Sequence, residues 1–360
     1  MKVVNLIGFV TVILLFIFSM FTLRAGSKSK QSNIFLTLFL LTNLFYLLDY
    51  ILPDLSRLFN INTEAFNGIG ATFCFLFGPT LYFFTKSLTN KDYKFRSYNL
   101  VHFVLFICAL SLVIFSIEIN KYLIYFIFSI QVILYLATCI KVIIKYRHSI
   151  KNFFSSVDHK INFTWLLYVV GAFMIMWTID FINLYLDYFD LINPILSSIL
   201  TFISISINFV FVILIFFKAL QEPQFLNDYA NERQIKYQGS NLSQEDKEDY
   251  LHRIENYFIE EHAYLNSSLT ILDVSNSTGI STKNISQVLN EVLNKNFYDF
   301  TNSFRIKLAK EKLVSNDDES LTVLEVLYDS GFNSKSAFNA AFKKHTGMTP
   351  TEFRRLQLAS

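Results

Sequence analysis

Seven long apolar stretches before residue 218 constrain the fold of this chain more than any other feature. A helix crosses the roughly 30 Å hydrocarbon core of a bilayer with about twenty apolar residues, and each stretch has that length. Hydrophobic residues make up 52% of the 360, more than a soluble chain of this size buries. We therefore predict an all-α protein that begins with a polytopic bundle of seven transmembrane helices, residues 1–218. The stretches cover residues 3–23, 33–52, 66–88, 98–119, 121–146, 163–186 and 195–217.

Positive charge gathers in the first, third and fifth loops of this predicted bundle. The residues are Arg24, Lys28 and Lys30, then Lys86, Lys91, Lys94 and Arg96, then Lys141, Lys145, Arg147, Lys151 and Lys160. Because positive loops stay in the cytoplasm, this pattern predicts an N-terminus outside and a C-terminal domain in the cytoplasm. A cleaved signal peptide over residues 1–23 is the alternative, but it would place the first positive loop outside.

A few polar residues interrupt the predicted spans. Asp49, Asp180 and Asn183 fall towards the outer ends of their helices, and Asn183 follows Asp180 by about one turn. Ionisable groups inside a membrane are costly, so they point to function by default. We expect these three to sense a small-molecule or protein signal in an outward-facing pocket, which could take a cation, a basic ligand or a periplasmic segment of a partner protein. The alternative is that they are hydrated groups near helix ends.

Residues 219–243 lose the apolar density and are rich in Gln, Asn, Glu and Asp, which predicts a polar stalk. Helical spacing resumes at 244, where we place the start of a C-terminal domain, residues 244–360. Its first helix has a possible second use as a dimer contact. The sequence shows no catalytic motif and no metal-ligand spacing, so we predict no enzyme activity, cofactor or metal site.

Within the C-terminal domain, one design occurs twice. Thr322 to Glu325 has the pattern of a capping box, Gly331 suits a tight turn, and Phe338 and Phe342 share one face of the helix that follows. About fifty residues upstream, Thr270, Asp273, Gly279, Ile285 and Leu289 take the corresponding places. The pattern predicts two helix-turn-helix units in tandem, whose second helices could enter the major groove of DNA about one duplex turn, ~34 Å, apart.

The segment from about 245 to 358 resembles the DNA-binding domain of the AraC/XylS family of bacterial transcription regulators. The resemblance rests on FYDFTNSFRIKLAKEKL and GFNSKSAFNAAFKKHTGMTPTEFRR, and covers about a third of the chain. It implies a protein that binds double-stranded promoter DNA and contacts RNA polymerase, as an activator more than a repressor. Together with the predicted transmembrane bundle, this leads us to expect a one-component regulator in a bacterial inner membrane.

Laid on the AraC pattern, the recognition helices are about 281–293 and 334–346. Side chains in six positions are expected to contact bases: Lys283, Ser286, Gln287, Lys335, Ser336 and Asn339. Five basic residues are expected to contact phosphates: Arg305, Lys307, Lys343, Lys344 and Arg354.

The predicted DNA-binding domain is only weakly basic, with eleven Lys and Arg against ten Asp and Glu between 265 and 360. We therefore expect modest affinity per copy and a working homodimer, favoured by confinement to a membrane. One rival is a transporter or membrane enzyme whose C-terminal domain only regulates it. Another is a regulator whose DNA-binding domain is released by proteolysis.

Overall fold

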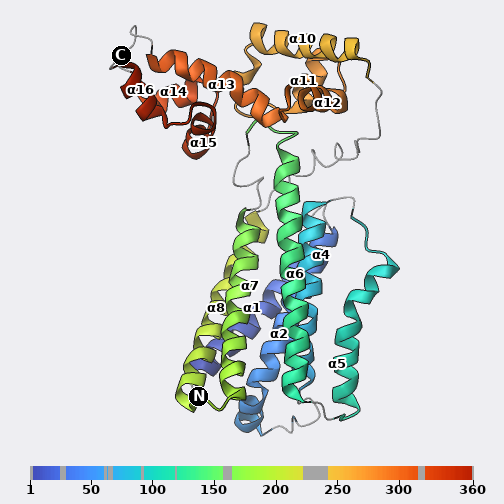
Figure 1. The fold of residues 1–360 in the computed structure, drawn as a ribbon. Helices are drawn as coiled ribbons and strands as arrows, with labels where there is room; N and C mark the ends of the chain where they lie inside the picture. Colours follow the sequence, from blue (N-terminus) through green and yellow to red (C-terminus); the bar gives the residue numbers. More distant parts are fainter. Residues whose placement is uncertain are drawn as a thin grey trace. The chain divides into compact units, whose positions relative to one another are not determined.

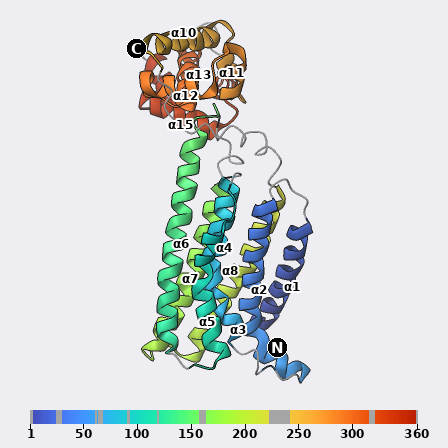
Figure 2. The same ribbon diagram turned by 90° about the vertical axis from the view of Figure 1, so that its right-hand side faces the viewer.

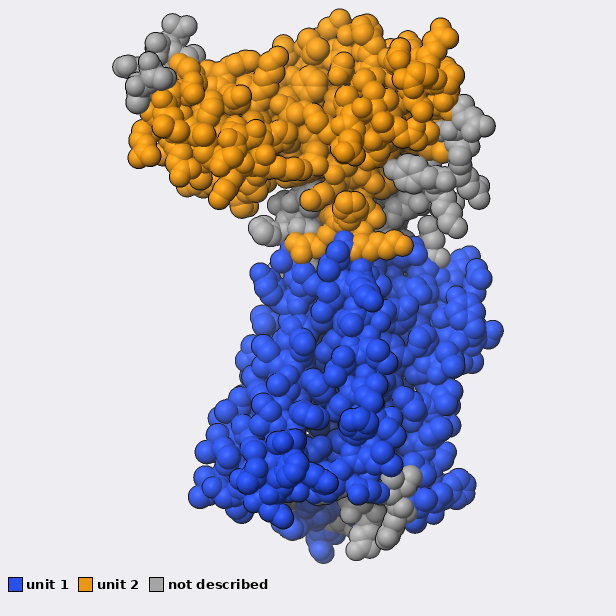
Figure 3. All heavy atoms as spheres, in the orientation of Figure 1, with its two compact units in different colours: residues 1–144, 163–231 blue, residues 145–162, 232–360 orange. Residues whose placement is uncertain are grey.

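In the computed structural model, the chain divides into two compact units (Figure 3). Unit 1 comprises residues 1–144 and 163–231, and unit 2 comprises 145–162 and 232–360. The structure describes residues 3–24, 30–60, 63, 68–90, 93–117, 120–156, 164–221, 242–314 and 321–358. Most of the predicted stalk lies outside these ranges. The described residues form helices and connecting turns without any β-sheet, which confirms the all-α fold class.

Unit 1 is a bundle of long helices that run side by side in both ribbon views (Figures 1 and 2). Helix α2 contacts α1 and α4, and α8 contacts α1 and α7. The helices are α1 (Val3–Arg24), α2 (Lys30–Phe59), α3 (Ile69–Thr72), α4 (Cys74–Thr89), α5 (Val104–Ile114) with the 3-10 turn η2 (Ser97–Phe103) before it, α6 (Lys121–Ile150), α7 (Thr164–Tyr188) and α8 (Pro194–Gln221).

Six of the described helical segments are long and apolar enough to cross a membrane, where the sequence predicts seven. The missing one is the predicted third span, 66–88. It forms the four-residue helix α3 and, after a break at Phe73, the 16-residue helix α4. The Asp49 carboxylate accepts hydrogen bonds from the backbone N–H groups of Gly68 and Gly70, both at 3.2 Å, at the start of α3.

Helix α4 packs in the interior of unit 1. Most of its side chains are buried, including Phe77, Leu81 and Phe83. Gly78 lies against Tyr135 of α6, where a Cβ atom would come within 2.5 Å of the ring.

Unit 2 contains seven further α-helices in its described residues. The long helix α13 lies between two groups of smaller helices (Figure 1). The seven helices are α10 (Gln244–Glu260), α11 (Ile271–Thr278), α12 (Thr282–Leu293), α13 (Phe297–Val314), α14 (Val323–Asp329), α15 (Lys335–Thr346) and α16 (Pro350–Leu358), with the 3-10 turn η4 (Ala263–Leu265) after α10.

The local signals in the sequence determine where these helices begin and end. Thr270 and Asp273 form a full capping box at the start of α11, and Thr322 and Glu325 form another at the start of α14. The backbone is left-handed at Gly279 (φ 69°), where α11 ends. Asn294 and Gly347 take the same conformation after α12 and α15, so the two helices end in the same way.

Candidate nucleic-acid interface

Two helix-turn-helix units make up the candidate interface. The first is α11 followed by α12, and the second is α14 followed by α15. In the second unit, Gly331 sits in the turn with φ 85°, and a Cβ atom there would lie 2.5 Å from the backbone oxygen of Tyr264. Any side chain at 331 would therefore push the second unit away from the segment that precedes the first.

Helix α15 has a buried face and an open face. Phe338 and Phe342 are fully buried in a cluster with Phe332 and residues of α13 and α14. Lys335, Ser336 and Asn339 lie on the exposed side, and the Ser336 hydroxyl is 2.9 Å from that of Ser334, the N-cap residue. The three predicted base-contacting side chains of the second unit are thus brought together on one accessible surface.

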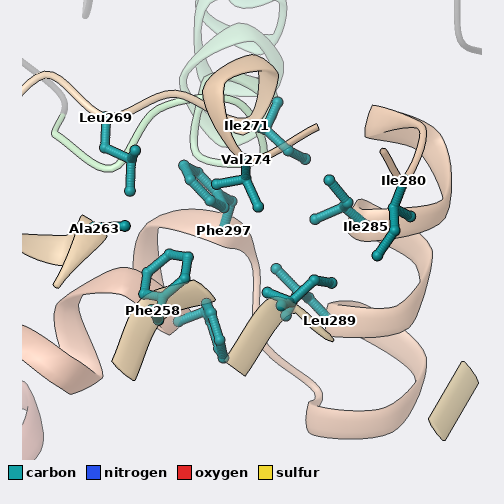
Figure 4. Packing of buried hydrophobic residues seen from close by; sticks show 11 residues of the cluster. Phe258, Ala263, Leu269, Ile271, Val274, Ile280, Ile285, Leu289 and Phe297 are labelled. Carbon is teal, nitrogen blue, oxygen red and sulfur yellow. The ribbon is translucent and has the colours of Figure 1, made fainter. Parts of the chain in front are cut away.

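Helix α12 is anchored in the same way, but its outer face is less open. Ile285 and Leu289 are fully buried (Figure 4). Lys283, Ser286 and Gln287 are half-buried, and each has a partner within the chain. Gln287 hydrogen-bonds the carboxylate of Glu291, one turn later. Glu291 also forms an ion pair of 2.9 Å with Lys247 of α10, and these bonds lower the pKa of its carboxyl group.

Arg305 is a correction to the predicted set of phosphate contacts. It lies in the middle of α13 with its side chain fully buried, so its guanidinium cannot reach a phosphate. Burial lowers its pKa to about 10, which still leaves it charged at neutral pH. The resemblance suggested an exposed basic residue, but the apolar residues around it on α13 place it in the interior.

The partners of Arg305 explain how a buried charge is tolerated. Nε donates to the backbone oxygen of Tyr264 at 2.7 Å, and Nη2 donates to that of Asn266 at 2.8 Å. Nη1 donates to the backbone oxygen of Ser155 at 3.0 Å, and Nη2 to its hydroxyl at 3.0 Å. The guanidinium also lies 5.5 Å from the ring of Phe332, in the second unit's turn. All three donor nitrogens are thus satisfied, and one side chain links three separate segments.

The segment after α6 is a structural part of unit 2. We refer to Lys151–Ser156 as the docking segment. Phe154 and Thr270 form an isolated antiparallel bridge, in which Ser155 N–H donates to Leu269 at 3.1 Å and Ile271 N–H donates to Phe153 at 3.0 Å. The Phe153 side chain packs against the core of the first helix-turn-helix unit.

Sequence reasoning assigned the docking segment to a loop of the membrane domain. Its contacts group it instead with the C-terminal unit, together with the last residues of α6. The available signal was the pair Phe153 and Phe154, two large apolar residues within an otherwise polar loop. That signal shows that a partner surface exists, but it does not identify the surface.

The other predicted phosphate contacts lie on the outside of unit 2. Lys307 and Lys343 are exposed, and Arg354 is half-buried on α16. Lys344 is exposed too, but its Nζ lies 2.7 Å from a carboxylate oxygen of Asp299 on α13. Binding a phosphate there would compete with this ion pair.

The three residues predicted to sense a signal are only partly brought together. Asp180 and Asn183 both contact α8, since Asp180 hydrogen-bonds Ser204 and the Asn183 side-chain amide lies 3.4 Å from the Thr201 hydroxyl. Asp49 instead binds the backbone of Gly68 and Gly70, so it has a structural role at the start of α3.

Two cores joined by one long helix, each presenting a helix on its outside, define a double helix-turn-helix domain. In agreement with this, residues 274–356 match the family model described as "Helix-turn-helix domain". The resemblance of the C-terminal domain to AraC-type regulators is thereby confirmed.

Several curated proteins are similar to this part of the chain. An uncharacterized HTH-type transcriptional regulator of Staphylococcus aureus is 31% identical over 97 residues, which cover 27% of this chain and 12% of that protein. The transcriptional activator RhrA of Rhizobium meliloti is 29% identical over 28% of this chain and 31% of its own length. An uncharacterized HTH-type transcriptional regulator of Pseudoalteromonas carrageenovora is 29% identical over 34% of this chain and 72% of its own length. These matches cover between 27% and 34% of this chain, and the chain spans about an eighth of the staphylococcal relative.

Proposed function

We propose that this protein is a membrane-bound one-component transcription regulator. It binds promoter DNA sequence-specifically through α12 and α15, and a signal received by unit 1 changes that binding. The similarity to proteins named as transcriptional regulators supports the DNA-binding half of this proposal. Six apolar helices in the same chain support the membrane half.

The proposed location is the bacterial inner membrane, with the N-terminus outside and the C-terminal domain in the cytoplasm. We count α3 and α4 together as a seventh crossing, which gives the odd number that the loop charges require. The proposed working form is a homodimer that contacts RNA polymerase, because the near-neutral charge of the domain gives one copy little electrostatic affinity for DNA.

The observation that carries the gating proposal is the place of the docking segment. It follows directly on α6, and it binds Arg305 through Ser155 and the first helix-turn-helix core through Phe153. A movement of α6 would therefore act on the residue that links the two helix-turn-helix units, without passing through the stalk. This favours a regulator over a transporter with a DNA-binding-like tail, because a merely appended tail needs no such connection.

The proposal is tested with the full-length protein in lipid nanodiscs. Genomic fragments are selected for binding, and the enriched fragment is titrated at several salt concentrations. We expect saturable binding to the enriched sequence, much weaker binding to a scrambled one, and affinity that falls as salt rises. Equal binding to both sequences would refute sequence-specific recognition, and a C-terminal reporter found outside the cytoplasm would refute the topology.

A second measurement separates gating from DNA binding. Ser155→Ala and Ser156→Ala together remove the two docking-segment hydroxyls that Arg305 contacts, while Ser303→Ala removes a hydroxyl of α13 that bonds only its own helix. We expect the double variant to change promoter output in cells and the control to leave it unchanged. The same output from all three proteins would count against transmission through the docking segment.

A further inference from the structure

A pocket of about 120 Å³, partly open to the surface, lies in unit 1 where five helices meet. Residues of α2, α4, α6, α7 and α8 line it, and most of them are aromatic or aliphatic. Asp180 is the only charged side chain among the described residues of this lining. The Asp180 side chain is exposed to this pocket, and a carboxylate within a bundle of apolar helices is uncommon, so the chemistry around it indicates what the pocket accepts.

Asp180 of α7 faces a row of polar side chains on α8. Thr201, Ser204 and Asn208 are spaced three and four residues apart, so their side chains share that face. The Asp180 carboxylate accepts a hydrogen bond from the Ser204 hydroxyl, and Asn208 lies one turn further along the helix. Ser204 and Asn208 line the pocket together with Asp180.

The orientation of the Asn208 amide follows from its neighbours. Asn43 Nδ2 donates to the backbone oxygen of Phe39 at 3.3 Å, which leaves Asn43 Oδ1 as the acceptor facing α8. Asn208 Nδ2 donates to that oxygen at 3.2 Å. The Asn208 Oδ1 atom is then buried without a hydrogen-bond partner in the described structure. An unsatisfied buried acceptor lowers the stability of the fold by about 1–3 kcal/mol, so a ligand that donates a hydrogen bond to this oxygen would recover part of that free energy.

These features favour one class of ligand. The Asp180 carboxylate and the Asn208 oxygen are both acceptors, and the walls include the aromatic rings of Tyr46 and Trp177. An ammonium group supplies N–H donors and a positive charge, which the faces of aromatic rings also attract. An anion would be repelled by Asp180, and a neutral apolar molecule would leave the Asn208 oxygen unpaired.

We propose that this pocket binds a small organic ammonium ion, with the ammonium group between Asp180 and Asn208 and its carbon skeleton against the aromatic wall. An apolar cavity of about 150 Å³ admits benzene, which has six non-hydrogen atoms, so a volume of 120 Å³ suits a ligand of about five. This inference rests on the proposed function, because it names the chemical class of the signal that unit 1 receives.

The test uses intrinsic fluorescence of the full-length protein in nanodiscs. The chain has two tryptophans, Trp165 and Trp177, and only Trp177 lines this pocket. In a Trp165→Phe background, tryptophan emission therefore comes from Trp177 alone and reports on this pocket. The probes are isobutylamine, protonated at neutral pH, with isobutanol and isobutyrate as neutral and anionic molecules of nearly the same shape.

We expect a saturable change in fluorescence with isobutylamine. The dissociation constants of the other two probes should be at least about tenfold higher. Asp180→Asn should abolish this preference, and Asn208→Leu should reduce it. Asp187→Asn is the matched control, because Asp187 lies on the same helix but does not line the pocket. It should bind isobutylamine as the parent does.

Equal responses to all three probes, an unchanged preference in Asp180→Asn, or no response from a folded protein would each overturn the proposal. Binding of the enriched promoter fragment is measured on the same nanodiscs. Ammonium binding without any DNA binding would leave the site standing and refute the proposed function. DNA binding without a preference for the ammonium probe would do the reverse.

Discussion

The two helix-turn-helix units share a design but differ in what surrounds them. The first is held on one side by the docking segment, through Phe153 and the bridge at Thr270, and on the other by α10, through the ion pair of Lys247 with Glu291. The second contacts the rest of the unit through α13 and the packing of Gly331 and Phe332, and its outward helix is open. The difference suggests a division of labour, in which the second unit is ready to contact DNA and the first is the one that a signal adjusts.

Replacement of Arg305 should have the largest effect, because this residue contacts both the docking segment and the second unit's turn. Replacing it with methionine leaves several buried carbonyl and hydroxyl oxygens without donors. We expect the free energy of unfolding of unit 2 to fall by about 3–5 kcal/mol, measured by chemical denaturation. Lys307→Met, two residues on and exposed, is the control and should change stability by less than about 0.5 kcal/mol. Similar losses in both variants would mean that Arg305 has no special structural role.

Phe153→Ala should affect the first unit and spare the second. The side chain is half-buried against the first core, so its removal should cost about 1–2 kcal/mol locally, below the range for a fully buried phenylalanine. Hydrogen exchange of the full-length protein should then be faster in α11 and α12 by about five- to thirtyfold, and unchanged in α14 and α15. Phe153→Leu should retain most of the protection. Equal acceleration in both units would contradict the separate anchoring of the first.

The predicted base-contacting surfaces of α15 and α12 differ in exposure. Asn339 is exposed, whereas Gln287 is half-buried and bonded to Glu291. Asn339→Ala should lose about 1–3 kcal/mol of discrimination at one base pair of the enriched sequence, and Gln287→Ala should lose less. Binding to a panel of single-base variants at fixed salt measures both effects. A uniform loss over all sequences would instead identify Asn339 as a backbone contact.

The smallest expected effect concerns pH and the capping glutamates of the second unit. Hydrogen bonds from Thr322 and Thr349 lower the pKa of Glu325 and Glu352 below their ordinary value of 4.5. A lowered pKa in the folded state gives stability that is present above pH 4.5 and is lost as the pH falls through the folded-state pKa. The unfolding midpoint of the wild type should therefore drop between pH 6 and 3, and the double variant E325Q/E352Q should drop less. The exposed Glu260→Gln should follow the wild type.

Much of unit 2 could be predicted because its signals are local. Capping boxes, left-handed residues at helix ends and the spacing of Phe338 and Phe342 act within a few residues, so they can be read without a fold. The candidate site was predicted less completely. The same helical spacing places Asn339 on an open surface and Gln287 beside Glu291, because exposure depends on what the neighbouring helices cover.

The sequence by itself determined that this chain has an apolar helical half and a double helix-turn-helix half, since length, hydrophobicity and capping are properties of short segments. Only the tertiary structure decided that Arg305 is buried, that the predicted third span is divided at Phe73, and that Phe153 packs against a core more than a hundred residues away. The reason is physical. The free energy of burying a side chain depends on the donors, acceptors and apolar surface that distant segments bring to it. No local sequence pattern contains this information.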